Sequence, residues 1–182
     1  MDDIKRIKNK IARENIDFFD LHGINLNGKK VLDVGFELGY NSKAMSDRGA
    51  SVYGVEPSDE DFKYAISNGL IDKNQAFNCL LQDIPEDLLG SFDIVTVFLY
   101  NIPILEREDF SNMLAKAVKT DGLVIIGMHD SLYITGDKYI EPVYSSIYKC
   151  FDSVRLIKGK KDNIGNISYI VASDPLFLVK GK

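Results

Sequence analysis

Hydrophobic positions near the start of the chain recur every three or four residues. Ile4, Ile7 and Ile11 form this stripe, and lysine and arginine residues lie between them. Because an α-helix completes a turn in about 3.6 residues, the stripe predicts a basic amphipathic helix that continues to Phe18 or Phe19. The stripe is narrow and the chain as a whole is acidic, which favours packing against the domain over the alternative of binding a membrane surface.

From residue 30 onward, short apolar runs alternate with amphipathic segments. The apolar runs are typical of buried strands, and the amphipathic segments end in glycine, as helices often do. Ser58 and Asp61 have the spacing of a helix capping box. The predicted strands are 30–35, 51–56, 76–81, 92–99 and 123–128, and the predicted helices are 41–49, 58–69 and 106–122. In the last of these segments Phe110, Met113, Leu114, Ala117 and Val118 lie on one side, and the helix is expected to end just before Gly122.

Repeated strand–helix–strand units predict parallel strands that are joined by right-handed crossovers. Residues 151–173 differ, because two β-rich runs are separated only by a polar turn that contains glycine. This pattern predicts a hairpin that adds an antiparallel strand to the sheet. The expected fold is therefore α/β, a doubly wound, Rossmann-like sheet of seven mostly parallel strands. One domain is expected over residues 1–182, with 1–22 as an N-terminal helical extension.

Composition narrows the function without identifying it. The chain has 182 residues, of which 45% are hydrophobic and 27% are charged, with a net charge of −5. The acidic balance argues against a broad nucleic-acid interface. No apolar run reaches the roughly 18 residues that a membrane span requires, and no secretory signal is visible, so a cytoplasmic location is expected. Cys79 and Cys150 lack CxxC spacing and are expected to be reduced thiols, and no metal site is predicted. The sequence carries no signal for the oligomeric state.

The turn after the first predicted strand is the strongest candidate for a ligand site. Ligands of open α/β sheets bind beyond the carboxyl ends of the strands, and Gly35 and Gly39 permit a close backbone approach there. Glu56 ends the second strand, where a carboxylate commonly binds ribose hydroxyls. Nicotinamide dinucleotides and S-adenosylmethionine both carry a ribose, so both are candidates.

Three features favour S-adenosylmethionine. Asp33 lies inside the first strand, where an anion suits a ligand that has an ammonium group better than it suits a pyrophosphate. Glu37 stands between the two glycines, so the dinucleotide pattern G-x-G-x-x-G is absent. The chain also offers no second domain for the substrate of a dehydrogenase.

Four stretches, in order, resemble the motifs of class I S-adenosylmethionine-dependent methyltransferases of the kind that modifies small molecules. They are "VLDVGFELG", "VYGVEPS", "LLQDIPEDLLGSFDIVTV" and "FLYNIPILEREDFSNMLAKAVKTDGLVII". The terminal hairpin is similar to the last two strands of that family. The resemblance covers residues 30–173 and implies methyl transfer from S-adenosylmethionine to a small-molecule acceptor by in-line displacement.

The resemblance also implies roles for individual residues. Asp33 would orient the methionine ammonium, and Glu56 would accept hydrogen bonds from both ribose hydroxyls. Asp83 would accept from the adenine amino group while the Ile84 N–H donates to a ring nitrogen, and apolar residues such as Phe36, Val55 and Ile84 would enclose the ring. The predicted cofactor-binding residues are Asp33, Gly35, Phe36, Glu37, Gly39, Glu56, Pro57, Asp83, Ile84 and Phe98.

Structural alternatives exist for these acids. Asp83 caps its loop in the first alternative, and Asp33 pairs with a lysine such as Lys30 in the second. Glu37, which departs from the family pattern, has three interpretations. It points to solvent, it joins Asp33 at the methionine ammonium, or its charge repels the methionine carboxylate and abolishes binding. The last interpretation supports a different function, a catalytically silent methyltransferase-like subunit that binds a partner.

The acceptor is expected near the end of the fourth strand, in "FLYNIP". Tyr100 and Asn101 stand there in place of histidines found in many relatives. Tyr100 and His129, which follows the fifth strand, are the candidate catalytic residues, the histidine because its free pKa of about 6.5 suits a general base. Tyrosines 133, 139, 144 and 148 favour an aromatic or partly apolar acceptor, although Tyr144 and Tyr148 have the spacing of a packing face. Arg155 and Lys158 to Lys161 form a basic cluster, expected to be a solvated turn, with RNA or a phosphorylated acceptor as the alternative.

Overall fold

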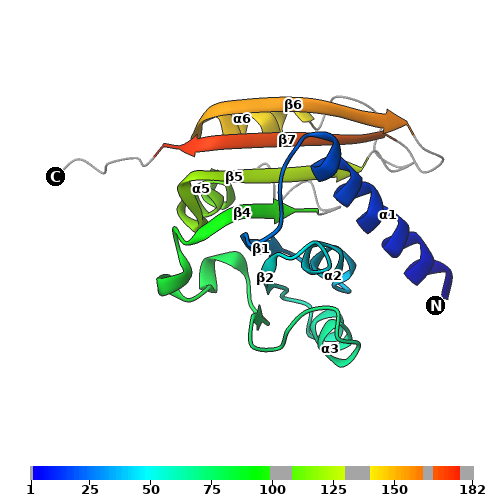
Figure 1. Ribbon diagram of the computed structural model, residues 1–182. Coiled ribbons are helices and arrows are strands. Elements are labelled where there is room, and N and C mark those ends of the chain that lie inside the picture. Colours follow the sequence, from blue (N-terminus) through cyan, green and yellow to red (C-terminus); the bar gives the residue numbers. More distant parts are fainter. Residues whose placement is uncertain (1, 99–107, 130–139, 162–165, 177–182) are drawn as a thin grey trace. The chain divides into compact units, whose positions relative to one another are not determined.

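The computed structural model describes residues 2–98, 108–129, 140–161 and 166–176 (Figure 1). The chain forms two compact units, Met1–Ile84 and Pro85–Lys182, which are described in turn. Among these described residues the strands follow the order β3-β2-β1-β4-β5-β7-β6 in a seven-stranded sheet. The predicted α/β fold class is therefore confirmed.

The first unit alternates helices with parallel strands. β1 pairs with β2 in parallel, with Asp33 opposite Gly54, and β2 pairs in the same way with β3. The predicted order of strands and helices is confirmed for this unit. Its elements are α1 (Asp2–Leu21), β1 (Lys30–Val34), α2 (Tyr40–Ser46), β2 (Ser51–Val55), α3 (Asp59–Ser67), β3 (Ala76–Phe77) and a 3₁₀ turn, η1 (Leu81–Asp83).

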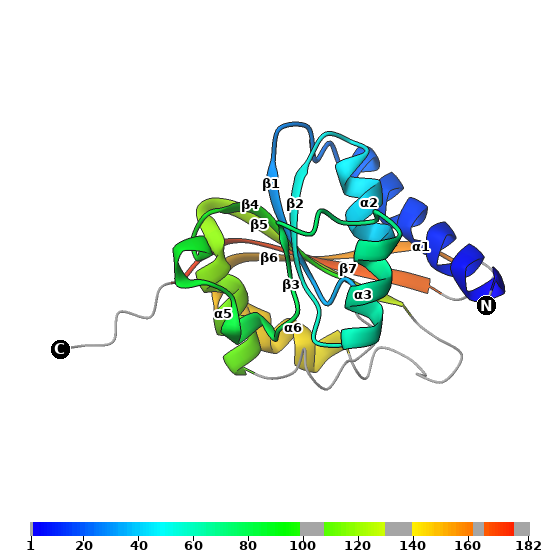
Figure 2. The ribbon, with the colours of Figure 1, turned by 90° about the horizontal axis from the view of Figure 1, so that it is seen from below.

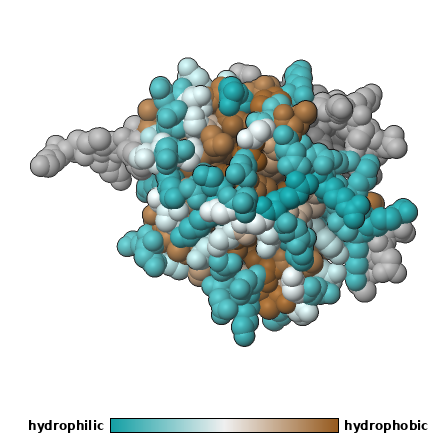
Figure 3. All heavy atoms as spheres, viewed as in Figure 1, coloured by the Kyte–Doolittle hydropathy of each residue, from teal (hydrophilic) through white to brown (hydrophobic). Residues whose placement is uncertain are grey.

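Helix α1 packs through its C-terminal half. Its buried residues are Ile11, Ala12, Asn15, Ile16, Phe18 and Phe19, whereas Ile7 is 43% exposed. α1 and α2 lie side by side, and the side-chain amide of Asn15 donates to Asn41 Oδ1 at 2.9 Å (Figure 2). Hydrophilic side chains gather on the outward side of α1 (Figure 3). The C-terminal half thus packs as its hydrophobic pattern predicts, but the N-terminal half extends beyond the core.

Helix α3 begins where the capping pattern predicts. Ser58 is its N-cap, and the Ser58 hydroxyl accepts a hydrogen bond from the Asp61 N–H at 3.3 Å. Ala65 of this helix is buried in a cluster with Phe36 and Ile71. Local side-chain chemistry alone therefore positions the start of this helix, because the cap satisfies an otherwise unpaired N–H.

The third strand is shorter than predicted. The sequence favours a strand over 76–81, but β3 ends at Phe77 and the chain enters η1 at Leu81. The Asn78 side-chain amide donates to the Glu56 carbonyl oxygen at 2.8 Å, and Leu80 is 46% exposed. After Phe77, a hydrogen bond from the Asn78 side chain thus replaces the main-chain bonds of a longer strand. The apolar run in the sequence gives no sign of this change.

The second unit combines one parallel strand pair with the predicted hairpin. β4 pairs in parallel with β5, and β7 is antiparallel to both β5 and β6. The antiparallel hairpin is therefore confirmed. The elements are η2 (Glu86–Leu88), β4 (Phe92–Val97), α5 (Glu108–Ala117), β5 (Val118–His129), α6 (Ile140–Tyr148), β6 (Phe151–Lys161) and β7 (Asn166–Pro175).

Two predicted boundaries in this unit are wrong. α5 ends at Ala117, so Val118 and Gly122 belong to β5 instead of to a helix and its end. The β4–β5 register shifts between Phe92 and Ile94, and a Cβ atom on Gly122 would lie only 2.9 Å from the Asp93 carbonyl oxygen. Glycine at 122 therefore permits close strand contact at a bulge. The basic residues 158–161 likewise end β6 and do not form the turn.

Both cysteines are free, with Cys79 half-buried and Cys150 buried, as expected of reduced thiols. Among the described residues, no helix is long and apolar enough to cross a membrane. The same residues contain no group of three or more His, Cys, Asp or Glu side chains that could hold a metal ion.

Candidate functional site

Glu56 lies at the centre of the candidate site, one residue beyond the end of β2. Its side chain is 5% exposed. The Glu37 N–H donates to Oε2 at 2.8 Å, and the Ser58 N–H donates to Oε1 at 2.7 Å. Burial raises the pKa of this carboxyl group above its ordinary value, although the two N–H groups act in the opposite direction. Each oxygen is thus held in place and keeps a lone pair for a second donor, an arrangement that suits a vicinal diol.

The main chain of Glu56 is held as firmly as its side chain. Its N–H donates to the Phe77 carbonyl oxygen at 3.0 Å, and its own carbonyl oxygen accepts from Asn78. The end of β3 therefore supports the carboxylate from the neighbouring strand. Asn78 was not predicted as a site residue, because nothing in a sequence indicates which strand neighbour a lone asparagine will contact.

The loop between β1 and α2 is built from left-handed residues. Gly35, Glu37 and Gly39 have φ values of 68°, 50° and 85°. The Gly35 N–H donates to the Val55 carbonyl oxygen and the Gly39 N–H to the Phe36 carbonyl oxygen, each at 2.8 Å. A non-glycine residue in this conformation costs about 1–2 kcal/mol. In this conformation, the Glu37 N–H donates to the buried carboxylate of Glu56.

The side chain of Glu37 forms an ion pair with Lys8 of α1. The side chains of Lys8 and Glu37 are 25% and 32% exposed, so the ion pair is partly accessible to solvent. None of the three interpretations drawn from the sequence included this partner. Lys8 is one of several lysines on a basic helix, and only the folded arrangement of α1 distinguishes it from the others.

Asp33 lies beneath the loop. It is 1% exposed, and the Ser42 hydroxyl donates to its Oδ2 at 2.6 Å. Asp33 therefore anchors the first turn of α2 to β1. Lys30, its suggested partner in the structural alternative, places its Nζ 4.8 Å from the ring centroid of Tyr53. A role for Asp33 toward an ammonium group stays a prediction.

The predicted adenine-contacting side chains are nearly fully buried. Phe36 is 2% exposed and packs so closely over β2 that a Cβ atom on Gly54 would lie 2.5 Å from its Cδ1. Val55 and Ile84 are 1% and 4% exposed, and the Ile84 N–H donates to the Leu81 carbonyl oxygen at 3.3 Å. Phe36 thus has a core-packing role, and contact of these groups with an adenine stays a prediction.

Asp83 and Pro57 are both exposed and belong to the first unit. Asp83 is the last residue of η1, and its negative charge interacts electrostatically with the half-buried thiol of Cys79. Burial first, and the Asp83 charge second, raise the pKa of Cys79 above its ordinary value. This thiol is therefore held in its protonated form at neutral pH and is a poor nucleophile.

The predicted residues of the second unit are less completely described. Phe98 is 8% exposed and packs against Gly127, where a Cβ atom would lie 2.6 Å from the ring. His129 is the last residue of β5, at the carboxyl end where it was expected. Tyr100, Asn101, Tyr133 and Tyr139 lie outside the described residues. Tyr144 and Tyr148 stack with ring centroids 6.2 Å apart, and the Tyr144 hydroxyl donates to the Val154 carbonyl oxygen. Tyr144 therefore packs as expected, whereas Tyr148 is 59% exposed, so the predicted packing face is only partly buried.

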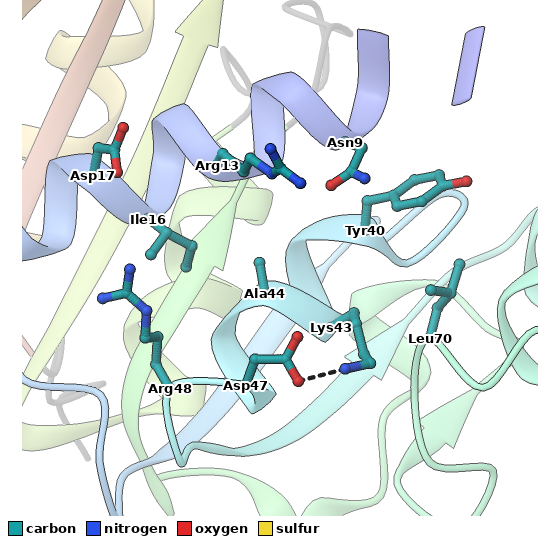
Figure 4. A pocket seen from close by; sticks show the side chains of 10 residues that line it. All are labelled: Asn9, Arg13, Ile16, Asp17, Tyr40, Lys43, Ala44, Asp47, Arg48 and Leu70. Atoms are coloured by element: carbon teal, nitrogen blue, oxygen red, sulfur yellow. Dashed lines mark hydrogen bonds and ion pairs between the residues drawn. The ribbon is translucent and has the colours of Figure 1, made fainter. Parts of the chain in front are cut away.

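A separate groove of about 610 Å³ lies between α1 and α2 (Figure 4). Arg13, Lys43 and Arg48 contribute positive charge to it, and Asp17 and Asp47 contribute negative charge. Lys43 pairs with Asp47 one helical turn away, and Arg48 donates to both carboxylate oxygens of Asp20. Because the charges are largely balanced, the groove has no clear preference for an anion or a cation.

Comparison with known proteins gives a consistent family assignment. A family model described as a methyltransferase domain matches residues 32–126, more than half of the chain. The ubiquinone biosynthesis O-methyltransferase of Idiomarina loihiensis is 32% identical over 117 residues, covering 63% of this chain and 48% of the relative. Its mitochondrial counterpart from Bos taurus is 31% identical, covering 57% and 30%. The chain therefore spans half or less of the length of these curated relatives.

Solved structures show the same fold. Magnesium protoporphyrin IX methyltransferase from Synechocystis, with bound S-adenosylmethionine, superposes with a TM-score of 0.65 at 22% identity, covering 92% of this chain and 81% of that one. A protein described as a putative S-adenosylmethionine-dependent methyltransferase from Listeria monocytogenes gives a TM-score of 0.68 at 14% identity, covering 90% and 97%.

Proposed function

The chain belongs to the class I S-adenosylmethionine-dependent methyltransferases, and from that premise we propose that it binds S-adenosylmethionine at Glu56 and methylates a small molecule. The buried, doubly anchored carboxylate of Glu56 carries the proposal. A ribose diol can donate one hydrogen bond to each oxygen without displacing the N–H groups of Glu37 and Ser58. Bonds to an ionised carboxylate are among the stronger hydrogen bonds in proteins.

The remaining parts of the site have matching roles. The loop from Gly35 to Gly39 brings main chain close to the amino-acid tail of the cofactor, with Asp33 beneath it. Pro57, Asp83 and Ile84 form the adenine side. When bound, the cofactor supplies an activated methyl group on its sulfonium sulfur. The protein's task is to align an acceptor and exclude water, so an obvious catalytic triad is not required.

Tyr100 and His129 are our proposed acceptor-side residues, with Phe98 nearby in sequence on the cofactor side. The position of His129 at the carboxyl end of β5 supports its assignment, because ligands of this fold class bind beyond that edge. The names of the curated relatives, which refer to ubiquinone biosynthesis, favour a small-molecule acceptor. The net charge of −5 favours it over a nucleic acid, and we propose a cytoplasmic location.

A catalytically silent, partner-binding subunit is the alternative function. Its support came from the charge of Glu37 beside the expected methionine carboxylate, and from Tyr100 and Asn101 in place of a histidine pair. In the structure that charge is paired with Lys8, and the Glu37 N–H holds the Glu56 carboxylate. This pairing weakens the part of the case for the alternative that rests on Glu37.

Calorimetric titration with S-adenosylhomocysteine, the demethylated cofactor, tests the proposal. We expect the wild-type protein to bind, and Glu56→Ala to weaken binding about 100-fold, since two hydrogen bonds to an ionised group are lost. Glu60→Ala, which removes an exposed carboxylate four residues away, is the control and should bind like the wild type. Wild-type protein that binds neither the cofactor nor its product, or full binding by Glu56→Ala, would refute the proposal.

A further inference from the structure

We propose that Lys8 and Glu37 form a subsite for the amino-acid tail of the cofactor, in which their mutual ion pair is exchanged for two ion pairs with the tail. Glu37 receives the ammonium group and Lys8 receives the carboxylate. This inference rests on the proposed function and assigns a cofactor contact to the N-terminal helix. Lys8 and Glu37 are positioning residues in this account, since neither takes part in methyl transfer.

The position of Glu37 relative to Glu56 supports the first half of the exchange. The N–H of Glu37 binds the same carboxylate that is proposed to hold the ribose. Its side chain leaves the same left-handed residue and points to α1, not into the core. The amino-acid tail of the cofactor is covalently joined to the ribose through sulfur and a methylene. The Glu37 side chain starts from a residue whose N–H contacts the diol-binding carboxylate of Glu56. Its own carboxylate is therefore within reach of that tail.

Charge complementarity supports the second half. An amino-acid tail carries one ammonium and one carboxylate group, and Lys8 with Glu37 presents one group of each sign. When the two pairs recombine, no charge is left without a partner. A glutamate alone at position 37 would repel the tail's carboxylate, whereas a glutamate accompanied by lysine offers a binding partner to both ends.

The ion pair that is broken in the exchange is a weak one. Both side chains are partly exposed, and ion pairs at such positions are weak because water screens them. Ile7, next to Lys8, is 43% exposed, so this turn of α1 is outside the core. Lys8 can therefore change partner without any loss of core packing.

Other contacts keep this turn of α1 at the loop. The Nζ atom of Lys5 lies 5.4 Å from the ring centroid of Tyr64, and the Tyr64 hydroxyl lies 3.3 Å from the hydroxyl of Tyr40, which follows Gly39. Further along the helix, Asn15 bonds Asn41 of α2. These contacts hold Lys8 close to the loop while its own ammonium group exchanges partners.

The test compares two ligands that differ only in the tail. S-adenosylhomocysteine carries the amino-acid tail, and 5′-methylthioadenosine has the same nucleoside and a thioether but no charged tail. We expect Lys8→Met to weaken S-adenosylhomocysteine about fivefold, because the carboxylate of the tail loses its partner and meets the charge of Glu37 alone, and to leave 5′-methylthioadenosine within about twofold. Lys10→Met, which removes a lysine of the same helix that pairs with Glu14, is the control and should alter neither affinity.

The reversed pair provides a second, independent measurement. Lys8→Glu alone should weaken S-adenosylhomocysteine more than Lys8→Met does, and Glu37→Lys in the same chain should recover part of that loss by restoring a pair of opposite charges. An unchanged affinity of Lys8→Met for S-adenosylhomocysteine, or an equal loss for both ligands, would overturn the inference. Failure of the wild type to bind either ligand would instead refute the proposed function, so the two failures are distinguishable.

Discussion

At the scale of single residues, the site depends on a carboxylate that folding disfavours in its charged form. Glu56 is 5% exposed, and burial is the largest influence that raises its pKa. The N–H groups of Glu37 and Ser58 lower the pKa but do not cancel the effect of burial. A carboxylate that is destabilised in this way gains most from a ligand that donates hydrogen bonds to it. The burial that disfavours the charged form of Glu56 in the ligand-free protein therefore also favours binding of a diol.

Glu56→Gln tests this cost through the pH dependence of stability. Because the pKa of Glu56 is raised in the folded state, its favourable contribution is fully present below 4.5 and is lost as the pH rises through the folded value. At neutral pH the wild type bears a penalty that the neutral glutamine avoids, but glutamine can accept only one of the two N–H bonds that the carboxylate accepts. The lost bond does not depend on pH, so we expect the melting temperature of the ligand-free variant to rise relative to that of the wild type as the pH is raised from 4.5 to neutral. Thermal unfolding followed by circular dichroism measures the difference, and a difference that stays constant over this range would contradict the prediction.

At the scale of elements, two glycines that both have positive φ angles have different surroundings. Gly39 precedes α2 with a φ of 85°, and Gly69 follows α3 with a φ of 64°. A Cβ atom on Gly39 would lie 3.0 Å from the Cβ atoms of both Ala65 and Leu70, whereas a Cβ atom on Gly69 would meet nothing within 4 Å. Alanine at either position adopts a strained conformation, but only at Gly39 does it also push α2 away from α3.

The pair of variants separates backbone strain from crowding. We expect Gly69→Ala to lower the free energy of unfolding by about 1 kcal/mol, the cost of a left-handed alanine. Gly39→Ala should lower it by about 2–4 kcal/mol, because overpacking adds to the strain, and should also weaken S-adenosylhomocysteine. Urea denaturation of both variants gives the two values. Equal losses would mean that α2 and α3 adjust freely to the extra methyl group.

The elements also show where sequence patterns stop being informative. Ser58 and Asp61 predicted the start of α3, because a cap is a contact between residues three positions apart. The end of β3 and the bulge at Gly122 were missed, since each depends on a neighbouring strand that a local pattern does not specify. The contact between Lys8 and Glu37 is equally hidden from a local pattern, because it joins a helix to a loop 29 residues away.

At the scale of the whole molecule, the prediction of one domain over residues 1–182 remains a prediction. The described chain forms two compact units, yet the matched methyltransferase domain, residues 32–126, includes parts of both. Most of the proposed cofactor residues, from Asp33 to Ile84, belong to the first unit, and His129 belongs to the second. Whether cofactor binding in one unit stabilises the other depends on whether the two units unfold cooperatively, and this can be measured directly.

Hydrogen exchange in the presence of S-adenosylhomocysteine provides that measurement. Ligand at about 100 times its Kd stabilises the folded state by about 2.7 kcal/mol, and it slows amides that exchange only through global unfolding by about 100-fold. Val31 and Leu32 of β1 and Ile125 and Ile126 of β5 are fully buried and are expected to be in this class. If the chain is one cooperative domain, both strands should slow by the same factor, because a single unfolding event exposes both. Slowing in β1 with no change in β5 would show that the two units unfold independently, and the single-domain prediction would then be wrong even if the cofactor binds as proposed.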